Sequence, residues 1–326
     1  MRILVVGGAG YIGSHMVRYL MDREHEVTVF DNLSTGHRDA VGDAEFVEGD
    51  LANAEQIDEV LRSAAFDGVM HFASSIQVGE SVSDPAKYYR NNVTNTQNLM
   101  DAMVATQTNY FVFSSTAAIF GNPEYVPMDE AHPKAPINPY GRTKLMVEQM
   151  LDDYDRAYGL KSVRLRYFNA AGAHPSGALG ERHEPETHLI PLILQAATGQ
   201  RDHIKVFGDQ YDTPDGTCVR DYIHICDLAE AHDLALKRLI ENRQTTSYNL
   251  GNGQGFSVSQ VIDVAKSVSG VDFSVVQAAA REGDPAVLIA DAQRARDELG
   301  WSPQYGALET IIDHAWRFER ARYGRP

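Results

Sequence analysis

The stretch Gly7-Gly8-Ala9-Gly10-Tyr11-Ile12-Gly13 lies between a short β-branched run, 3–6, and a helix-like segment, 11–21. Glycine is needed where a backbone turns sharply and where a phosphate approaches the main chain. The amino end of the following helix adds N–H groups and the positive end of a dipole. A strand, a glycine-rich turn and a helix in this order predict the first unit of a sheet that binds a dinucleotide.

The rest of the first half of the chain repeats the order of strand and helix. After the first strand, the predicted strands are 27–30, 45–47, 69–72, 110–113 and 163–167. Asn53 and Asn138 are typical N-caps, and a long helix is predicted over 85–103. Pro139 stands at a first helical position, where a missing N–H costs nothing. Repeated strand–helix units predict an α/β fold with a doubly wound parallel sheet of the Rossmann type.

The pattern of the second half is looser, with irregular loops and short helices from Asn169 onward. We therefore predict two domains: a dinucleotide-binding domain over 1–168 and a smaller C-terminal, substrate-binding domain over 169–326. A regular helix over 227–240 indicates that roughly 221–252 returns to the main sheet.

Composition excludes several classes of partner. The formal charge is −16, from 45 acidic and 29 basic residues, which argues against nucleic acid or an anionic membrane as the main partner. No apolar run approaches the roughly 18 residues that a membrane helix needs. Cys218 and Cys226 are the two cysteines, too few for a disulfide scaffold, so a reducing cytoplasm is the expected location.

The histidines give no standard metal signature. None of the 12 histidines forms an HExxH motif. His183 and His188 stand five residues apart near glutamates, but this spacing is not typical of a metal site. We expect no metal.

Asp31 stands at the end of the second predicted strand. A carboxylate at this place accepts hydrogen bonds from the ribose of an adenosine, and it repels a 2′-phosphate. The sequence therefore predicts NAD, rather than NADP, as the cofactor.

Tyr140 and Lys144 are four residues apart in a predicted helix, which places the phenol and the ammonium on one face, about 6 Å apart along the axis. A phenol with a pKa near ~10 is a poor base at neutral pH. A neighbouring lysine and a cationic nicotinamide both favour the phenolate, so both are expected to lower this pKa. Tyr140 is then able to accept a proton during hydride transfer.

Longer motifs carry a family resemblance. GGAGYIGSH, the pair Asp31-Asn32, HFA at 71–73, YxxxK and RYFN resemble the extended short-chain dehydrogenase/reductases. Within that group the similarity is to the UDP-glucose 4-epimerase (UDP-galactose 4-epimerase) family, from Met1 to about Trp301. Its motifs are VGESVSDPAKYYRNNV, YGRTKLMVEQ, RYFNAAGAHPSG, DGTCVRDYIHICDLA and REGDPA.

The resemblance implies an activity and a set of residues. Tyr140, helped by Lys144, takes the proton of the sugar 4-hydroxyl, and Thr116 hydrogen-bonds the same oxygen. The implied cofactor-binding residues are Gly7, Gly10, Tyr11, Ile12, Gly13, Asp31, Asn32, Asp50, Leu51, Phe72, Ala73, Asn92, Ser114, Tyr140, Lys144 and Tyr167. The implied substrate-binding residues are Thr116, Tyr140, Asn169, His188, Leu189, Phe207, Arg220, Arg281, Asp284 and Leu288. The family also implies a homodimer joined by a four-helix interface, from the segments 85–103 and 138–158.

The stretch FSSTAAIFG, 113–121, separates related activities. Sugar-nucleotide dehydratases of the same superfamily carry an Asp-Glu pair after the strand-end hydroxyl, and those acids eliminate water. This chain has Ala117 and Ala118 there, which favours C4 epimerisation of UDP-glucose and UDP-galactose. Leu288, at the position that faces the hexose 2-substituent, favours this pair over N-acetylated sugars. Epimerases of UDP-N-acetylhexosamines, UDP-pentoses or UDP-uronates, a net sugar dehydrogenase and an inactive NAD-binding regulator remain alternatives.

Overall fold

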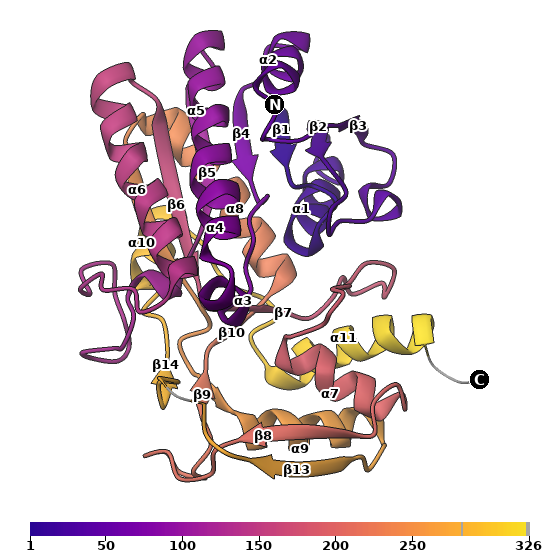
Figure 1. Ribbon diagram of the computed structural model, residues 1–326. Helices are drawn as coiled ribbons and strands as arrows, with labels where there is room; N and C mark the ends of the chain where they lie inside the picture. Colours follow the sequence, from indigo (N-terminus) through magenta and orange to yellow (C-terminus); the bar gives the residue numbers. More distant parts are fainter. Residues whose placement is uncertain (282, 324–326) are drawn as a thin grey trace.

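A computed structural model describes residues 1–281 and 283–323 of the chain (Figure 1). Its main sheet has seven parallel strands in the order β11-β6-β5-β4-β1-β2-β3. They are β1 (Arg2–Val6), β2 (Glu26–Asp31), β3 (Glu45–Glu48), β4 (Gly68–His71), β5 (Tyr110–Thr116), β6 (Lys161–Tyr167) and β11 (Thr246–Leu250). The strand order reverses at β1, which lies between β2 and β4. This is the predicted doubly wound parallel sheet.

Helices cover both faces of this sheet. On one face lie α1 (Tyr11–Met21) and α8 (Ile225–Asn242); on the other lie α2 (Ala54–Ser63), α5 (Asn95–Thr106) and α6 (Pro139–Tyr158). Successive strand residues point to opposite faces. Val5 therefore packs in the cluster of α1 and α8, and Leu4 in the cluster of α2, α5 and α6.

The predicted helix starts are confirmed. The Asn53 side chain accepts from the N–H groups of Glu55 and Gln56, and the Asn138 side chain accepts from that of Gly141 at 2.8 Å. Pro139 is the first residue of α6.

The segment predicted as one helix over 85–103 is different. It consists of α4 (Pro85–Tyr88), a π-helical stretch (Tyr89–Thr94) and α5. The widened turn carries Asn92, whose buried side chain accepts from the N–H of Ser75 at 2.8 Å and donates to the hydroxyl of Thr143 at 3.1 Å. Periodicity does not reveal such a turn, because its cause lies in contacts with distant segments.

The remaining elements lie mainly at one end of the main sheet (Figure 1). Small sheets pair β10 (Tyr222–His224) with β7 (Asn169–Ala171), β9 (Val219–Arg220) with β12 (Phe256–Ser257) and β14 (Val287–Leu288), and β8 (His203–Phe207) with β13 (Ser274–Ala278). The helices α7 (Leu189–Ala197), α9 (Val258–Ser269) and α11 (Leu308–Tyr323) share a second core. Shorter helices are α3 (Val78–Ser83), α10 (Gln293–Leu299) and the 3-10 turns Arg38–Val41 and Ala117–Ile119.

In the described part of the chain, no helix combines the length and apolar character that crossing a bilayer requires.

Candidate active site

In the glycine turn between β1 and α1, neighbouring atoms crowd Gly7 and Gly13 but leave space at Gly10. A Cβ at Gly7, whose φ is +80°, would lie 2.5 Å from the backbone nitrogen of Ala73. A Cβ at Gly13 would lie 2.1 Å from the carbonyl oxygen of Gly7. At Gly10, the N-cap of α1, the nearest atom would be 3.5 Å away. The turn thus leaves room at Gly10 for a pyrophosphate to approach the N–H groups at the start of α1.

Asp31 ends β2 beside this turn and is almost completely buried. Its carboxylate accepts hydrogen bonds from the N–H groups of Ala9, at 2.9 Å, and Leu33, at 2.8 Å. Burial raises the pKa of Asp31, although these two hydrogen bonds oppose the shift. Each oxygen keeps a further lone pair, so the pinned carboxylate is able to accept from a ribose. Asn32 donates to Asp50 at 2.9 Å and brings β3 to the same edge.

Other predicted cofactor residues lie along this edge. Leu51 is buried after β3, and Phe72 and Ala73 directly follow β4. Ile12 lies in the first turn of α1. The hydroxyl of the buried Tyr11 donates to the carbonyl of Gly172 at 2.7 Å, which ties the glycine turn to the loop after β7.

Thr116, Tyr140 and Lys144 meet where β5 ends and α6 begins. Thr116 is the last residue of β5, which extends three residues beyond the predicted strand. Lys144 donates to the hydroxyl of Ser74 at 2.8 Å and to the carbonyl of Ser114 at 2.9 Å. Burial lowers the pKa of Lys144 to about 7.

The phenol of Tyr140 is buried, and its pKa shifts upward. Desolvation raises the pKa of Tyr140, and a hydrogen bond with Thr116 lowers it in part. The protein alone therefore does not give the lowered pKa that the sequence predicted, because burial outweighs the contributions of neighbouring groups. The prediction also named a cationic nicotinamide ring, and this ring is the remaining group that would lower the pKa of Tyr140.

Ser114 and Tyr167, both predicted near the cofactor, share a hydrogen bond between their hydroxyls across β5 and β6. Asn92, in the π-helical stretch, fixes Ser75 just after β4 and Thr143 in α6. These residues therefore hold together the segments that carry Ser74, Ser114 and Lys144.

Four of the predicted substrate residues form one group, which β8, β9 and the loop between β13 and β14 contribute. Arg220 forms an ion pair with Asp284. The guanidinium of Arg281 lies 4.0 Å from the centroid of the Phe207 ring. Two guanidinium groups thus lie beside a carboxylate and an aromatic ring, an arrangement suited to the phosphates, ribose and base of a nucleotide.

Leu288 connects this group to the catalytic residues. It pairs with Arg220 in the register of β14 and β9. Its side chain packs against the cluster of Ile119, Phe120 and Met128, whose first member is three residues after Thr116. Asn169 donates to the carbonyl of Asp221, the residue after Arg220, at 2.9 Å.

His188 and Leu189 lie at the start of α7, with Leu189 packed against the second core. His188 contacts Glu181. The family resemblance implies that both residues bind the substrate, and that role stays a prediction.

The chain matches a family model, described as the NAD dependent epimerase/dehydratase family, over residues 3–251. It belongs to that family. NAD is accordingly its cofactor, and the resemblance stated above is confirmed. The chain is 49% identical over 320 residues to the UDP-glucose 4-epimerase of Halalkalibacterium halodurans, covering 98% of this chain and 96% of the relative.

Solved structures of similar proteins have the same fold. The UDP-glucose 4-epimerase of Brucella ovis, in complex with NAD, is 50% identical with a TM-score of 0.95 and 98% of each chain covered. The UDP-Glc/GlcNAc 4-epimerase of Campylobacter jejuni is 46% identical with a TM-score of 0.87, covering 98% of this chain and 99% of that one.

The buried ion pair of Glu148 and Arg166 was not predicted from the sequence. Arg166 donates to the two carboxylate oxygens of Glu148 at 2.9 and 2.6 Å. Ser115, the residue before Thr116, donates to the same carboxylate at 2.7 Å. Glu148 lies four residues after Lys144 and so on the same helix face. The spacing of Tyr140, Lys144 and Glu148 was the signal in the sequence, and the pair locks α6 to β5 and β6.

Proposed function

We propose that the chain is a UDP-glucose 4-epimerase, which inverts C4 of a UDP-hexose through a 4-keto sugar. The observation that carries this proposal is the meeting of Thr116, Tyr140 and Lys144 at an end of β5 that continues with Ala117 and Ala118. The site offers a hydroxyl and a phenol for a proton at O4, but no acid there for the elimination of water. Relatives that match this chain over nearly their full length, at 49% and 50% identity, are named UDP-glucose 4-epimerases.

The fit to NAD rests on the open space at Gly10 and the pinned carboxylate of Asp31. Bound NAD supplies a reversible acceptor for the C4 hydride, which returns to the opposite face of the sugar. Tyr140 accepts the proton of the 4-hydroxyl and gives it back in the second half of the reaction. Thr116 holds the same oxygen by a hydrogen bond, and Lys144, in its protonated form, favours the phenolate together with a cationic nicotinamide. The hydride of C4 and the proton of the 4-hydroxyl both return to the sugar, so the overall reaction has no net oxidation or reduction.

The proposed substrate contacts follow from the group of residues around Arg220. We assign the pyrophosphate to Arg220 and Arg281, the ribose to Asp284, and the uracil to Phe207 and Leu189. We assign Asn169 to the sugar–phosphate region, and His188 to the same region through its Nε2, because its Nδ1 contacts Glu181. The nucleotide is then held firmly at one end, while the hexose remains free to turn over between the two half-reactions.

A second candidate function is epimerisation of UDP-N-acetylhexosamines. The Campylobacter jejuni relative, named for UDP-Glc and UDP-GlcNAc, favours it. Leu288 is larger than alanine or glycine and packs against the cluster of Ile119, Phe120 and Met128, so the space for a 2-acetamido group is limited. We therefore propose UDP-glucose and UDP-galactose as the preferred substrates.

The test is to incubate the purified protein with separate UDP-sugars and no added NAD, and to separate the products. Interconversion of UDP-glucose and UDP-galactose without net formation of NADH is the expected result. Net NADH formation would indicate a dehydrogenase, a 4-keto-6-deoxy product would indicate a dehydratase, and binding without turnover would indicate a regulator.

We also propose a homodimer, a cytoplasmic location and the domain division at residue 169. The helices α5 and α6 lie side by side on one face of the sheet (Figure 1), and Met146 on α6 is exposed. Light scattering is expected to give twice the chain mass of 36.1 kDa.

A further inference from the structure

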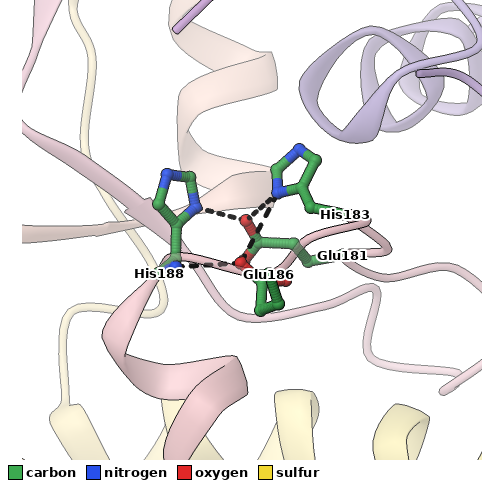
Figure 2. A group of neighbouring side chains, drawn as sticks. All are labelled: Glu181, His183, Glu186 and His188. Atoms are coloured by element: carbon green, nitrogen blue, oxygen red, sulfur yellow. Dashed lines mark hydrogen bonds and ion pairs between the residues drawn. The ribbon is translucent and has the colours of Figure 1, made fainter. Parts of the chain in front are cut away.

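One loop before α7 brings together two carboxylates and two imidazoles. Glu181, His183, Glu186 and His188 each offer one donor atom, and these four atoms lie within 4.8 Å of one another (Figure 2). We propose that they form a binding site for a divalent transition-metal ion of the Zn²⁺ type. The site goes beyond the proposed epimerase activity, and it departs from our expectation of no metal.

The donor atoms converge on a common centre. The Nδ1 atoms of His183 and His188 both point at one carboxylate oxygen of Glu181, the former at 3.0 Å (Figure 2). The Nδ1 of His183 also lies 3.7 Å from an oxygen of Glu186. Zinc bonds of roughly 2.0–2.2 Å at tetrahedral angles separate neighbouring ligand atoms by roughly 3.3–3.6 Å. Small side-chain rotations therefore suffice to place an ion among the four.

The charges of the cluster favour a cation. The carboxylates of Glu181 and Glu186 are 5% and 3% exposed, and two buried negative charges are costly unless they are compensated. Two imidazolium ions are one way to compensate them. The rings of His183 and His188 are only 5.3 Å apart between centroids, however, so two such charges repel each other. A divalent ion compensates both carboxylates while both imidazoles remain neutral.

The surroundings orient the ligands. One oxygen of Glu186 accepts from the N–H groups of Thr187, at 2.7 Å, and His188, at 2.9 Å. This is the same oxygen that lies 3.7 Å from the Nδ1 of His183, so the two backbone hydrogen bonds fix the orientation of the carboxylate within the cluster. The side chain of His188 is 42% exposed, which leaves an entry path for an ion and room for a water ligand.

The position of the site indicates a structural role. The ring of His183 packs edge-on against that of Tyr11 in the glycine turn, with centroids 6.3 Å apart. Next to it, Arg182 forms an ion pair with Asp39 at 2.9 Å. An ion in this cluster would fix the loop between the cofactor turn and the start of α7. Imidazole and carboxylate donors suit Zn²⁺, Co²⁺ or Ni²⁺ better than Mg²⁺.

The proposal is tested by measuring metal binding to protein without an affinity tag, and this measurement does not depend on enzymatic activity. After dialysis against a chelator, Zn²⁺ is titrated in the presence of excess Mg²⁺, and bound metal is measured by elemental analysis. We expect one Zn²⁺ per chain and a rise in melting temperature. Binding is expected to release protons and to weaken as the pH falls, because protons compete with the metal ion for the histidine nitrogens.

Single variants locate the ion. His183→Gln and His188→Gln are each expected to weaken binding by at least about 10-fold, as loss of a ligand exceeds loss of an outer contact. His174→Gln is the matched control, because His174 precedes the same loop and contacts Ser176 instead of the cluster. If a histidine variant fails to fold, the visible spectrum of the unaltered protein with Co²⁺ distinguishes protein nitrogen and oxygen ligands from hydrated ion. Less than one Zn²⁺ per chain, or equal losses in His174→Gln and His183→Gln, would overturn the proposal.

Discussion

The ammonium of Lys144 donates a hydrogen bond to the backbone carbonyl of Ser114 at 2.9 Å. This contact joins the first turns of α6 to the end of β5, two residues before Thr116. The phenol of Tyr140 and the hydroxyl of Thr116 are thereby held at one place. Lys144 thus has a positioning role as well as a charge, and replacing it removes both.

Tyr140→Phe removes only the hydroxyl group that is the proposed proton acceptor and keeps the aromatic ring. Because proton transfer by a positioned side chain contributes roughly 10²–10⁴-fold, we expect kcat for UDP-galactose to fall by about that factor. Tyr323→Phe, at the exposed end of α11, is the control and is expected to keep its rate. A Tyr140→Phe enzyme with most of its activity would show that another group is the base.

Thr116 is tested by two replacements that differ in one group. Thr116→Ser keeps the hydroxyl, and we expect it to retain at least a large share of kcat. Thr116→Ala removes the hydrogen bond that lowers the pKa of Tyr140, so kcat is expected to fall and the acid limb of its pH profile to move to higher pH. Equal activity in both variants would remove Thr116 from the proton path.

Asp31→Ser tests the choice of cofactor. The loss of a charged acceptor for the ribose, worth about 1.5–3 kcal/mol, is expected to weaken NAD binding by roughly 10-fold or more. Repulsion of a 2′-phosphate also disappears, so the ratio of NADP to NAD affinity is expected to rise. Asp43→Ser, in the exposed turn before β3, is the control. Both affinities are measured by fluorescence titration of stripped enzyme.

Lys144→Met tests the lowered pKa of Lys144 through stability. The pKa is about 7 in the folded chain and 10.5 ordinarily, so the unfolded chain binds more protons between these values. The stability of the unaltered protein therefore rises with pH through this window, and the burial penalty is fully present below pH 7. The gain in melting temperature of Lys144→Met is expected to be largest near pH 6 and to shrink toward pH 10. A gain that is independent of pH would contradict the shift.

Leu288→Ala tests the limit on the sugar 2-substituent. Removing the isobutyl group next to the cluster of Ile119 and Met128 opens space, and a pocket change of this kind is worth roughly 10–200-fold in discrimination. We expect the kcat/KM ratio of UDP-GlcNAc to UDP-glucose to rise by about 10-fold or more. Val287→Ala, in the same strand, is the matched control. Equal kcat/KM for the two sugars in the unaltered enzyme would show that Leu288 sets no limit.

Several features were readable in the sequence because they depend on neighbours in the chain. The glycine turn, the carboxylate of Asp31 and the caps Asn53 and Asn138 act through backbone conformation and adjacent N–H groups. The four-residue step from Tyr140 to Lys144 follows from helix geometry alone. Ala117 and Ala118 likewise distinguished epimerisation from dehydration without any coordinates.

Other features were decided only by tertiary structure, since they depend on groups far apart in the chain. Desolvation set the pKa of Lys144 and of Tyr140, and it depends on all the segments that cover them. The partner of Glu148 is Arg166 on another strand, and the π-helical turn at Asn92 serves contacts with Ser75 and Thr143. The spacing of Glu181, His183, Glu186 and His188 matched no familiar motif, and only the path of the loop turns their donor atoms toward one point. The local sequence determines which side chains are available. Packing determines which of these side chains come into contact and how much water remains around them.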